Sequence, residues 1–274
     1  MADEEDKDVA QYVFPTLQKS GFPFQTTIVD IVRNNGRWHV DDEEIPWRDD
    51  GGRDHFLDFA ATNRHCIITV ECKKTEKDIY TFLLPPLQKG TTEDPVTRSA
   101  RCDFLIRIND STQRLEMQCG DWRLLPRTPE SAFCVVANTD ANRRMLEADV
   151  QLLLRGTDAY GYRRKRAEKP GPRERPGAPL VPVLVTNAKL FVARIQPNAV
   201  WLETGQVQDH TAAEVRPIDV IRFRKAFVSH RTRDLGERTV LVVRATALEK
   251  LLCDLEVDVQ EDGPIGPIAN MSDP

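Results

Sequence analysis

The sequence has no apolar run long enough to cross a bilayer, which takes about 20 residues. The acidic first segment, MADEEDKD, lacks the basic and apolar regions of a signal peptide. The six cysteines include no C-x-x-C pair, and a zinc site from Cys102, Cys119 and Cys134 has little support in their spacing. We therefore expect reduced thiols, a cytosolic compartment and no membrane partner.

Several enzyme signatures are also missing. No Walker lysine loop, G-x-G-x-x-G or H-E-x-x-H motif occurs, so nucleotide-driven and zinc-protease chemistries have no positive support. The five histidines form no recognisable pattern with a cysteine nucleophile. What is present is a chain of 274 residues, 40% hydrophobic and 30% charged, which can bury a substantial core.

The net charge of −5 hides an uneven distribution. Acids gather in residues 1–8, 40–54 and 254–274, and the rest of the chain carries 35 basic and 25 acidic residues. Basic residues concentrate in RGTDAYGYRRKRAEKPGPRER, 155–175. This stretch is either a phosphate-binding surface, with Arg163, Arg164, Lys165 and Arg166 as its contacts, or a solvated helix end followed by a linker.

Charged residues interrupt the apolar hairpin FLDFAATNRHCIITVECKK, 56–74. A turn at Asn63–Arg64 places Asp58 across from Thr69, and strand alternation then defines two faces. One face is apolar: Leu57, Phe59, Ala61, Cys66, Ile68, Val70 and Cys72. The other gathers Asp58, Glu71 and Lys73 near one end of the strand pair.

Two carboxylates and an amine at this spacing predict a metal-assisted phosphoryl chemistry, because carboxylate oxygens suit Mg²⁺ and the ion can lower the pKa of a bound water. Asp58 followed by Glu71-Cys72-Lys73 at the end of an apolar strand resembles the PD-(D/E)XK nuclease superfamily, although Leu57 replaces the proline. The resemblance implies that Asp58, Glu71 and the backbone carbonyl of Cys72 bind the metal. It also implies that Lys73 assists the attacking water.

The resemblance implies an α/β fold, a restriction-endonuclease-like mixed β-sheet flanked by helices. Residues 1–258 would form one domain, with a β-rich insertion at 84–138, a Pro-rich loop at 169–179 and a flexible acidic tail at 259–274. The sequence predicts a helix over 8–22, kinked or split at Pro15, and a strand over 23–34. Residues 23–34, 55–62 and 66–73 should form a three-stranded antiparallel meander. Further strands are expected at 103–108, 114–125, 132–137, 180–195, 219–228 and 238–245, with helices at 140–168 and 246–256.

The function that follows is a Mg²⁺-dependent nuclease, with Mn²⁺ as a substitute, acting on DNA or alternatively on RNA. Lys74 and Lys77 would reach flanking phosphates. The family usually has a further glutamate on the first helix, and Glu5, Asp6 and Asp8 all compete for that role. A degenerate module of the same fold that binds nucleic acid or a partner protein is the alternative, and a purely structural subunit is a third. The sequence leaves homo-oligomerisation open.

Overall fold

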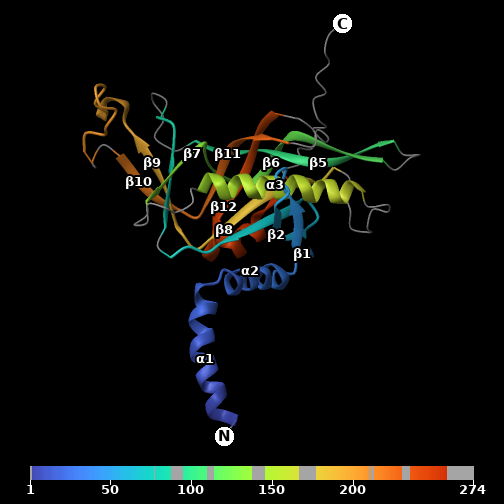
Figure 1. Cartoon of the computed structure of the whole chain (residues 1–274). Coiled ribbons are helices and arrows are strands. Elements are labelled where there is room, and N and C mark those ends of the chain that lie inside the picture. Colours follow the sequence, from blue (N-terminus) through green and yellow to red (C-terminus); the bar gives the residue numbers. More distant parts are fainter. Residues whose placement is uncertain are drawn as a thin grey trace.

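The protein is a mixed α/β structure dominated by β-sheet (Figure 1). The computed structural model describes residues 2–76, 78–87, 95–109, 114–137, 146–166, 177–209, 211, 213–229 and 235–257. The helices are α1 (Ala2–Lys19), α2 (Phe22–Asn34), α3 (Leu146–Arg166) and α4 (Leu248–Asp254). The strands are β1 (His39–Arg48), β2 (Asp54–Thr62), β3 (Ile67–Lys73), β4 (Ile79–Leu83), β5 (Val96–Asn109), β6 (Arg114–Ser131), β7 (Phe133–Ala137), β8 (Pro179–Thr186), β9 (Lys189–Ile195), β10 (Ala213–Ile218), β11 (Val220–Val228), β12 (Leu235–Arg244) and β13 (Glu256–Val257). No helix among the described residues is both long and apolar enough to span a membrane.

Residues 23–34 form helix α2, so the predicted strand there is wrong. The segment is rich in β-branched residues, which favour strands, but Ile28, Val29 and Val32 share one helical face and are all buried. A proline lies in the first turn, where the missing backbone N–H costs nothing. The first helix, α1, ends at Lys19 with Pro15 inside it, and Figure 1 shows it leading away from the sheet to the N-terminus.

Strand β1 takes the place that we expected for residues 23–34, and the antiparallel meander is β1-β2-β3. The hairpin register differs from the predicted one, because Ala60, and not Asp58, pairs with Thr69. The Asn63 side chain accepts hydrogen bonds from the backbone N–H groups of His65 and Cys66, which closes a longer turn. A shift of two residues preserves the faces of both strands and moves Asp58 towards the level of Glu71.

The sheet continues from β3 to β8, which runs parallel to it after a crossover through α3. Helix α3 covers one face, where the core includes Leu153, Leu154 and Tyr160. Helices α2 and α4 cover the other face, where Ile28 and Leu251 pack against strand residues such as Val70. The hairpin is therefore covered on both faces, and its polar face meets α3.

Five strands close into a ring, because β8 pairs with both β12 and β5, β12 pairs with β11, β11 with β6, and β6 with β5. The segment at 84–138 is β-rich as predicted, but its long strands β5 and β6 belong to this ring. Strand β7 joins β4, β9 and β10 in a separate four-stranded sheet of the described chain. The segment thus contributes to both sheets of the protein.

Candidate active site

Asp58 lies on β2 between Leu57 and Phe59, which pair with Ile45 and Glu43 of β1. The residue facing it, Glu44, has a backbone φ of 47°, in the left-handed region that non-glycine residues rarely adopt. Leu57 packs into the core under α3 while Phe59 packs into the opposite core, so the predicted face of Leu57 is wrong. The other apolar-face residues, from Phe59 to Cys72, pack in the core of α2 and α4 as predicted.

The Asp58 carboxylate lies at the backbone of Cys72. Its Oδ2 atom accepts a hydrogen bond from the Cys72 N–H at 2.6 Å, just beyond the last hydrogen-bonded pair of the β2–β3 ladder. The carboxylate therefore lies beside the residue that follows Glu71. This contact fixes Asp58 at the end of β3, where the sequence places the candidate metal ligands.

Three carboxylates, those of Asp58, Glu71 and Glu44, surround the Cys72 thiol in this region. Burial, with a smaller contribution from the negative charge of Glu44, raises the pKa of Asp58 to about 6, against the opposing hydrogen bonds from the backbone N–H and the thiol of Cys72. Burial and the charges of Asp58, Glu71 and Glu44 hold the pKa of the Cys72 thiol well above its usual value. An accumulation of negative charge with a raised carboxyl pKa is typical of a site that binds a cation or a proton.

Glu44 is the acidic residue that sequence reasoning missed. It belongs to the acidic run in 40–54, which we interpreted only as a charged surface segment. Two features bring Glu44 to this region: its left-handed backbone, and the pairing of β1 with β2 as the first strand of the meander. Gln25 of α2 donates a hydrogen bond to it, so α2 supports this carboxylate from the neighbouring layer.

Lys73 points towards α3. Its Nζ atom lies 3.0 Å from the carboxylate of Asp149, whose side chain is only 6% exposed. Thr69 lies two residues before Glu71 on β3 and so on the same face of the strand. Its hydroxyl hydrogen-bonds to the hydroxyl of Thr157 on α3 at 2.7 Å. The Lys73 amine is thus held next to the hairpin by a buried acid that no sequence motif indicated.

The other candidate residues near the hairpin are less well placed. Lys74 donates a hydrogen bond from Nζ to the backbone oxygen of Ser20 at 3.2 Å. Lys77 lies outside the described residues. Glu5, Asp6 and Asp8 fall in the first turns of α1, which Figure 1 shows running away from the sheet, and their side chains are outside the described part. Of these residues only the Lys74 side chain is described, and its hydrogen bond goes to Ser20 and not to Asp58.

The basic end of α3 meets the acidic strand β1. Arg163 forms an ion pair with Asp42 at 3.1 Å, and Arg164 lies 3.4 Å from Asp41. Lys165 stacks over the ring of Tyr162, and Arg166 is exposed. The four basic residues predicted to contact phosphates thus divide into two with acidic partners in the fold and two without an ion pair among the described residues.

The donor chemistry fits Mg²⁺ in kind. Asp58, Glu71 and Glu44 offer hard carboxylate oxygens, and Mg²⁺ is commonly held by only one or two protein carboxylates and several waters. Within the described ranges, no three His, Cys, Asp or Glu side chains are arranged to hold a metal ion by themselves. The described residues therefore form no closed metal cage, and an ion held here would have to keep most of its waters.

Comparison with known proteins gives this chain no relatives: no family model, curated protein or solved structure matches it.

Proposed function

We propose that the protein is a Mg²⁺-dependent nuclease that hydrolyses phosphodiester bonds in DNA, with RNA as a second candidate substrate. The observation that carries the proposal is the position of the Asp58 carboxylate at the backbone N–H of Cys72, the residue between Glu71 and Lys73 on β3. Mn²⁺ would substitute for Mg²⁺, since both are hard cations that bind oxygen ligands.

The fold supports the resemblance to the restriction-endonuclease-like nucleases. A helix is followed by a three-stranded antiparallel meander, in the order that the resemblance implies, and a mixed sheet lies between helices. The acidic pair and the lysine lie on the last strand of that meander and its neighbour. Fold analogy is an associational argument, so the chemistry of the site must carry the function.

Each residue has a separate role in the proposed reaction. Asp58, Glu71 and the carbonyl of Cys72 would hold Mg²⁺, which supplies Lewis acidity and a water of lowered pKa. Asp58 must be ionised to bind a cation, and with its pKa raised to about 6 it is mostly ionised at neutral pH. Lys73 would stabilise negative charge on the phosphate, and Asp149 would orient its amine.

A catalytically silent module that binds nucleic acid or a partner protein is the second candidate. The ion pair between Lys73 and Asp149 favours it, because the amine already has a strong partner. The lack of a three-donor cluster in the described residues also favours it. In this case the charged site would be a remnant of the fold rather than a reaction centre.

A cleavage assay separates the two candidates. Single- and double-stranded DNA and RNA are incubated with the protein and Mg²⁺ or Mn²⁺, and with EDTA as the metal-free reference. For the nuclease we expect metal-dependent cleavage that Glu71→Gln lowers by at least about 100-fold, since that change removes a ligand charge. The matched control, Glu203→Gln, makes the same change at an exposed position and should cleave normally. Binding without cleavage by the wild type would favour the silent module.

A further inference from the structure

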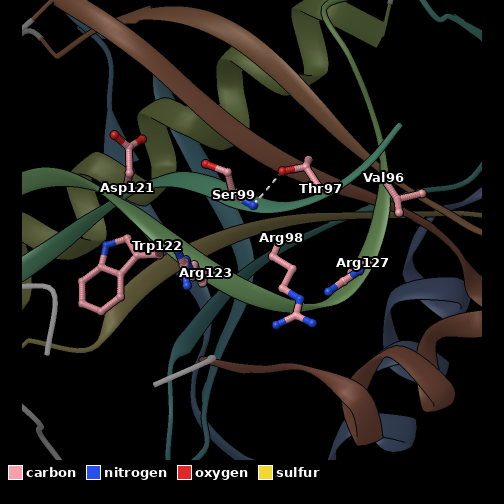
Figure 2. Close-up of a pocket in the computed structure, with 8 residues that line it drawn as sticks. All are labelled: Val96, Thr97, Arg98, Ser99, Asp121, Trp122, Arg123 and Arg127. Atoms are coloured by element: carbon pink, nitrogen blue, oxygen red, sulfur yellow. Dashed lines mark hydrogen bonds between the residues drawn. The ribbon is translucent and has the colours of Figure 1, made fainter. Parts of the chain in front are cut away.

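The structure contains a basic cavity away from the candidate active site. Its lining includes none of the residues proposed for hydrolysis. It has a volume of about 570 Å³ and lies between the start of β5 and the second half of β6. Figure 2 shows its lining, which consists of Val96, Thr97, Arg98, Ser99, Asp121, Trp122, Arg123 and Arg127. A cavity of this size is within the range of small-molecule sites.

The cavity forms where the two strands separate. Thr97 pairs with Thr128 and Ser99 pairs with Arg123. Between these pairs β5 has one residue, Arg98, and β6 has four, 124–127. The bulged part of β6 pairs instead with β13, where Leu124 and Leu125 are partners of Val257 and Glu256. The opening is therefore built into the strand pairing, and it does not depend on the position of a loose side chain.

A buried arginine fixes the wall of the cavity. Arg222 of β11 is 1% exposed, and it donates hydrogen bonds to the backbone oxygens of Leu124 at 2.6 Å and Pro126 at 3.0 Å. These carbonyls lie between Arg123 and Arg127 in the chain. The backbone that carries the two arginines is thus held rigid, and a site on a rigid scaffold binds its ligand with little ordering cost.

The charge of the cavity is positive. Three of its lining residues are arginines, and the acid among them, Asp121, forms an ion pair with Arg101 at 3.4 Å. In Figure 2 the side chains of Arg98 and Arg127 reach towards each other, while that of Asp121 points away from them. Arg123 and Arg127 have no ion-pair partner among the described residues. The positive charges of Arg123 and Arg127 therefore favour an anion in the cavity.

Trp122 adds an aromatic surface to the lining, and in Figure 2 its ring lies at the end of the cavity away from Arg98 and Arg127. Its side chain is partly exposed, and its ring packs edge-to-face against Phe104 with a centroid distance of 5.3 Å. Guanidinium groups bind phosphate oxygens through paired N–H donors, and indole rings stack with nucleobases. Their combination in one cavity suits a phosphate that carries a base better than an isolated inorganic ion.

We propose that this cavity binds the phosphate and base of a nucleotide unit in a single-stranded nucleic acid. Arg123 and Arg127 would contact phosphate oxygens, and Trp122 would stack with the adjoining base. The proposal goes beyond hydrolysis, because it holds equally for a catalytically silent module. A free nucleotide offers the same chemistry, so the test must distinguish the two sources.

The test measures binding in EDTA, where metal-dependent cleavage cannot occur. A fluorescent single-stranded oligonucleotide is titrated with the full chain, and anisotropy gives the affinity at several salt concentrations. Arg123→Gln combined with Arg127→Gln should weaken binding at least tenfold. It should also lower the slope of log K against log salt by about 1.4, since each phosphate contact to a single strand contributes about 0.7.

The matched control is Lys19→Gln combined with Lys189→Gln, which removes two positive charges from exposed positions elsewhere. It should leave the affinity and the slope nearly unchanged. Equal losses in both double variants would overturn the proposal, because a general charge effect would then explain binding. Failure of the wild type to bind the strand would overturn it as well.

Competition identifies the source of the phosphate. Three competitors are titrated against the labelled strand: an unlabelled strand, adenosine monophosphate and inorganic phosphate. Their concentrations are matched by the number of phosphate groups. The proposal expects the strand to compete best. If the mononucleotide or the inorganic ion competes equally well, the cavity is a site for a small anion, and the assignment to a nucleic-acid strand is wrong. Because no metal is present, these outcomes are independent of the proposed nuclease activity.

Discussion

The amine of Lys73 lies 3.0 Å from the carboxylate of Asp149 and joins strand β3 to helix α3 across the candidate active site. The Asp149 side chain is nearly buried, whereas that of Lys73 is 28% exposed. The pair therefore combines two functions: it compensates a buried charge, and it sets the position of the amine. These functions can be measured separately.

Lys73→Ala should lower the free energy of unfolding by about 1–3 kcal/mol, because it removes the cation that compensates the buried Asp149 charge. If Lys73 lay on an open polar face, its removal would leave the free energy of unfolding unchanged. Urea denaturation measures the loss. In the double variant Lys73→Ala/Asp149→Asn the uncompensated charge is absent, so its loss should be smaller than the sum of the two single losses. Strict additivity would show that the two residues are not coupled.

Lys73→Ala should also reduce single-turnover cleavage by on the order of 10²–10³-fold, the scale for one group that stabilises a transition state. Cys72→Ser is the comparison, because only the backbone carbonyl of Cys72 is proposed to act. A serine hydroxyl can still donate the hydrogen bond that the thiol makes to the Asp58 carboxylate. The change should cost some stability and little activity. An inactive Cys72→Ser protein beside an active Lys73→Ala protein would contradict the assigned roles.

Asp58 should make stability depend on pH. Its pKa is raised from 3.8 to about 6 on folding, so between these values the folded protein binds the proton more tightly than the unfolded chain does. Stability should therefore fall as the pH rises from about 4 to 6, by on the order of 3 kcal/mol, and then level off. Denaturation at several pH values measures this slope.

Asp58→Asn should flatten that slope and unfold less readily than the wild type at pH 7, because the amide carries no buried charge. Its oxygen can still accept the Cys72 N–H. Glu203→Gln, at an exposed position, should retain the wild-type slope. An unchanged slope in Asp58→Asn would assign the pH dependence to another group.

The end of α3 should contribute unequally to binding of duplex DNA. Arg163 and Arg164 have acidic partners on β1, whereas Lys165 and Arg166 have no ion pair among the described residues. Lys165→Gln/Arg166→Gln should lower the slope of log K against log salt by up to about 1.8, at about 0.9 for each lost contact. Arg163→Gln/Arg164→Gln, with the same change of charge, should lower it much less. Equal decreases would mean that the ion pairs open on binding.

The sequence predicted the local features of the hairpin better than its surroundings. Strand alternation placed Phe59 and Val70 in one core and Thr69 on the opposite face, and both assignments are confirmed. The turn register was off by two residues, because the turn runs from Asn63 to Cys66 and pairs Thr62 with Ile67, whereas the predicted turn ended at or before His65. The faces of the paired residues survived this error, since an even shift does not exchange them, whereas Leu57, which precedes the first pair of the ladder, lies on the other face.

The errors lie where tertiary contacts decide. β-branched residues suggested a strand at 23–34, but the spacing of Ile28, Val29 and Val32 suits a helix packed on a sheet. Glu44 reaches the site because its own backbone is left-handed and because β1 pairs with β2. Asp149 reaches it from the crossover helix α3, 76 residues after Lys73 in the chain. Neither has a local signal. Pairing across such distances cannot be read from one sequence without a known relative.

The closed ring of five strands has a consequence for synthesis of the chain on the ribosome. Strand β6 pairs with β11 through Glu130 and Arg222, and β8 pairs with β12, so several strand edges stay open until residues 220–244 have emerged. Long strands with open edges pair readily with other chains. Translation arrested after β10 should therefore release an aggregation-prone fragment, and the last quarter of the chain acts as the closing segment for strands made much earlier.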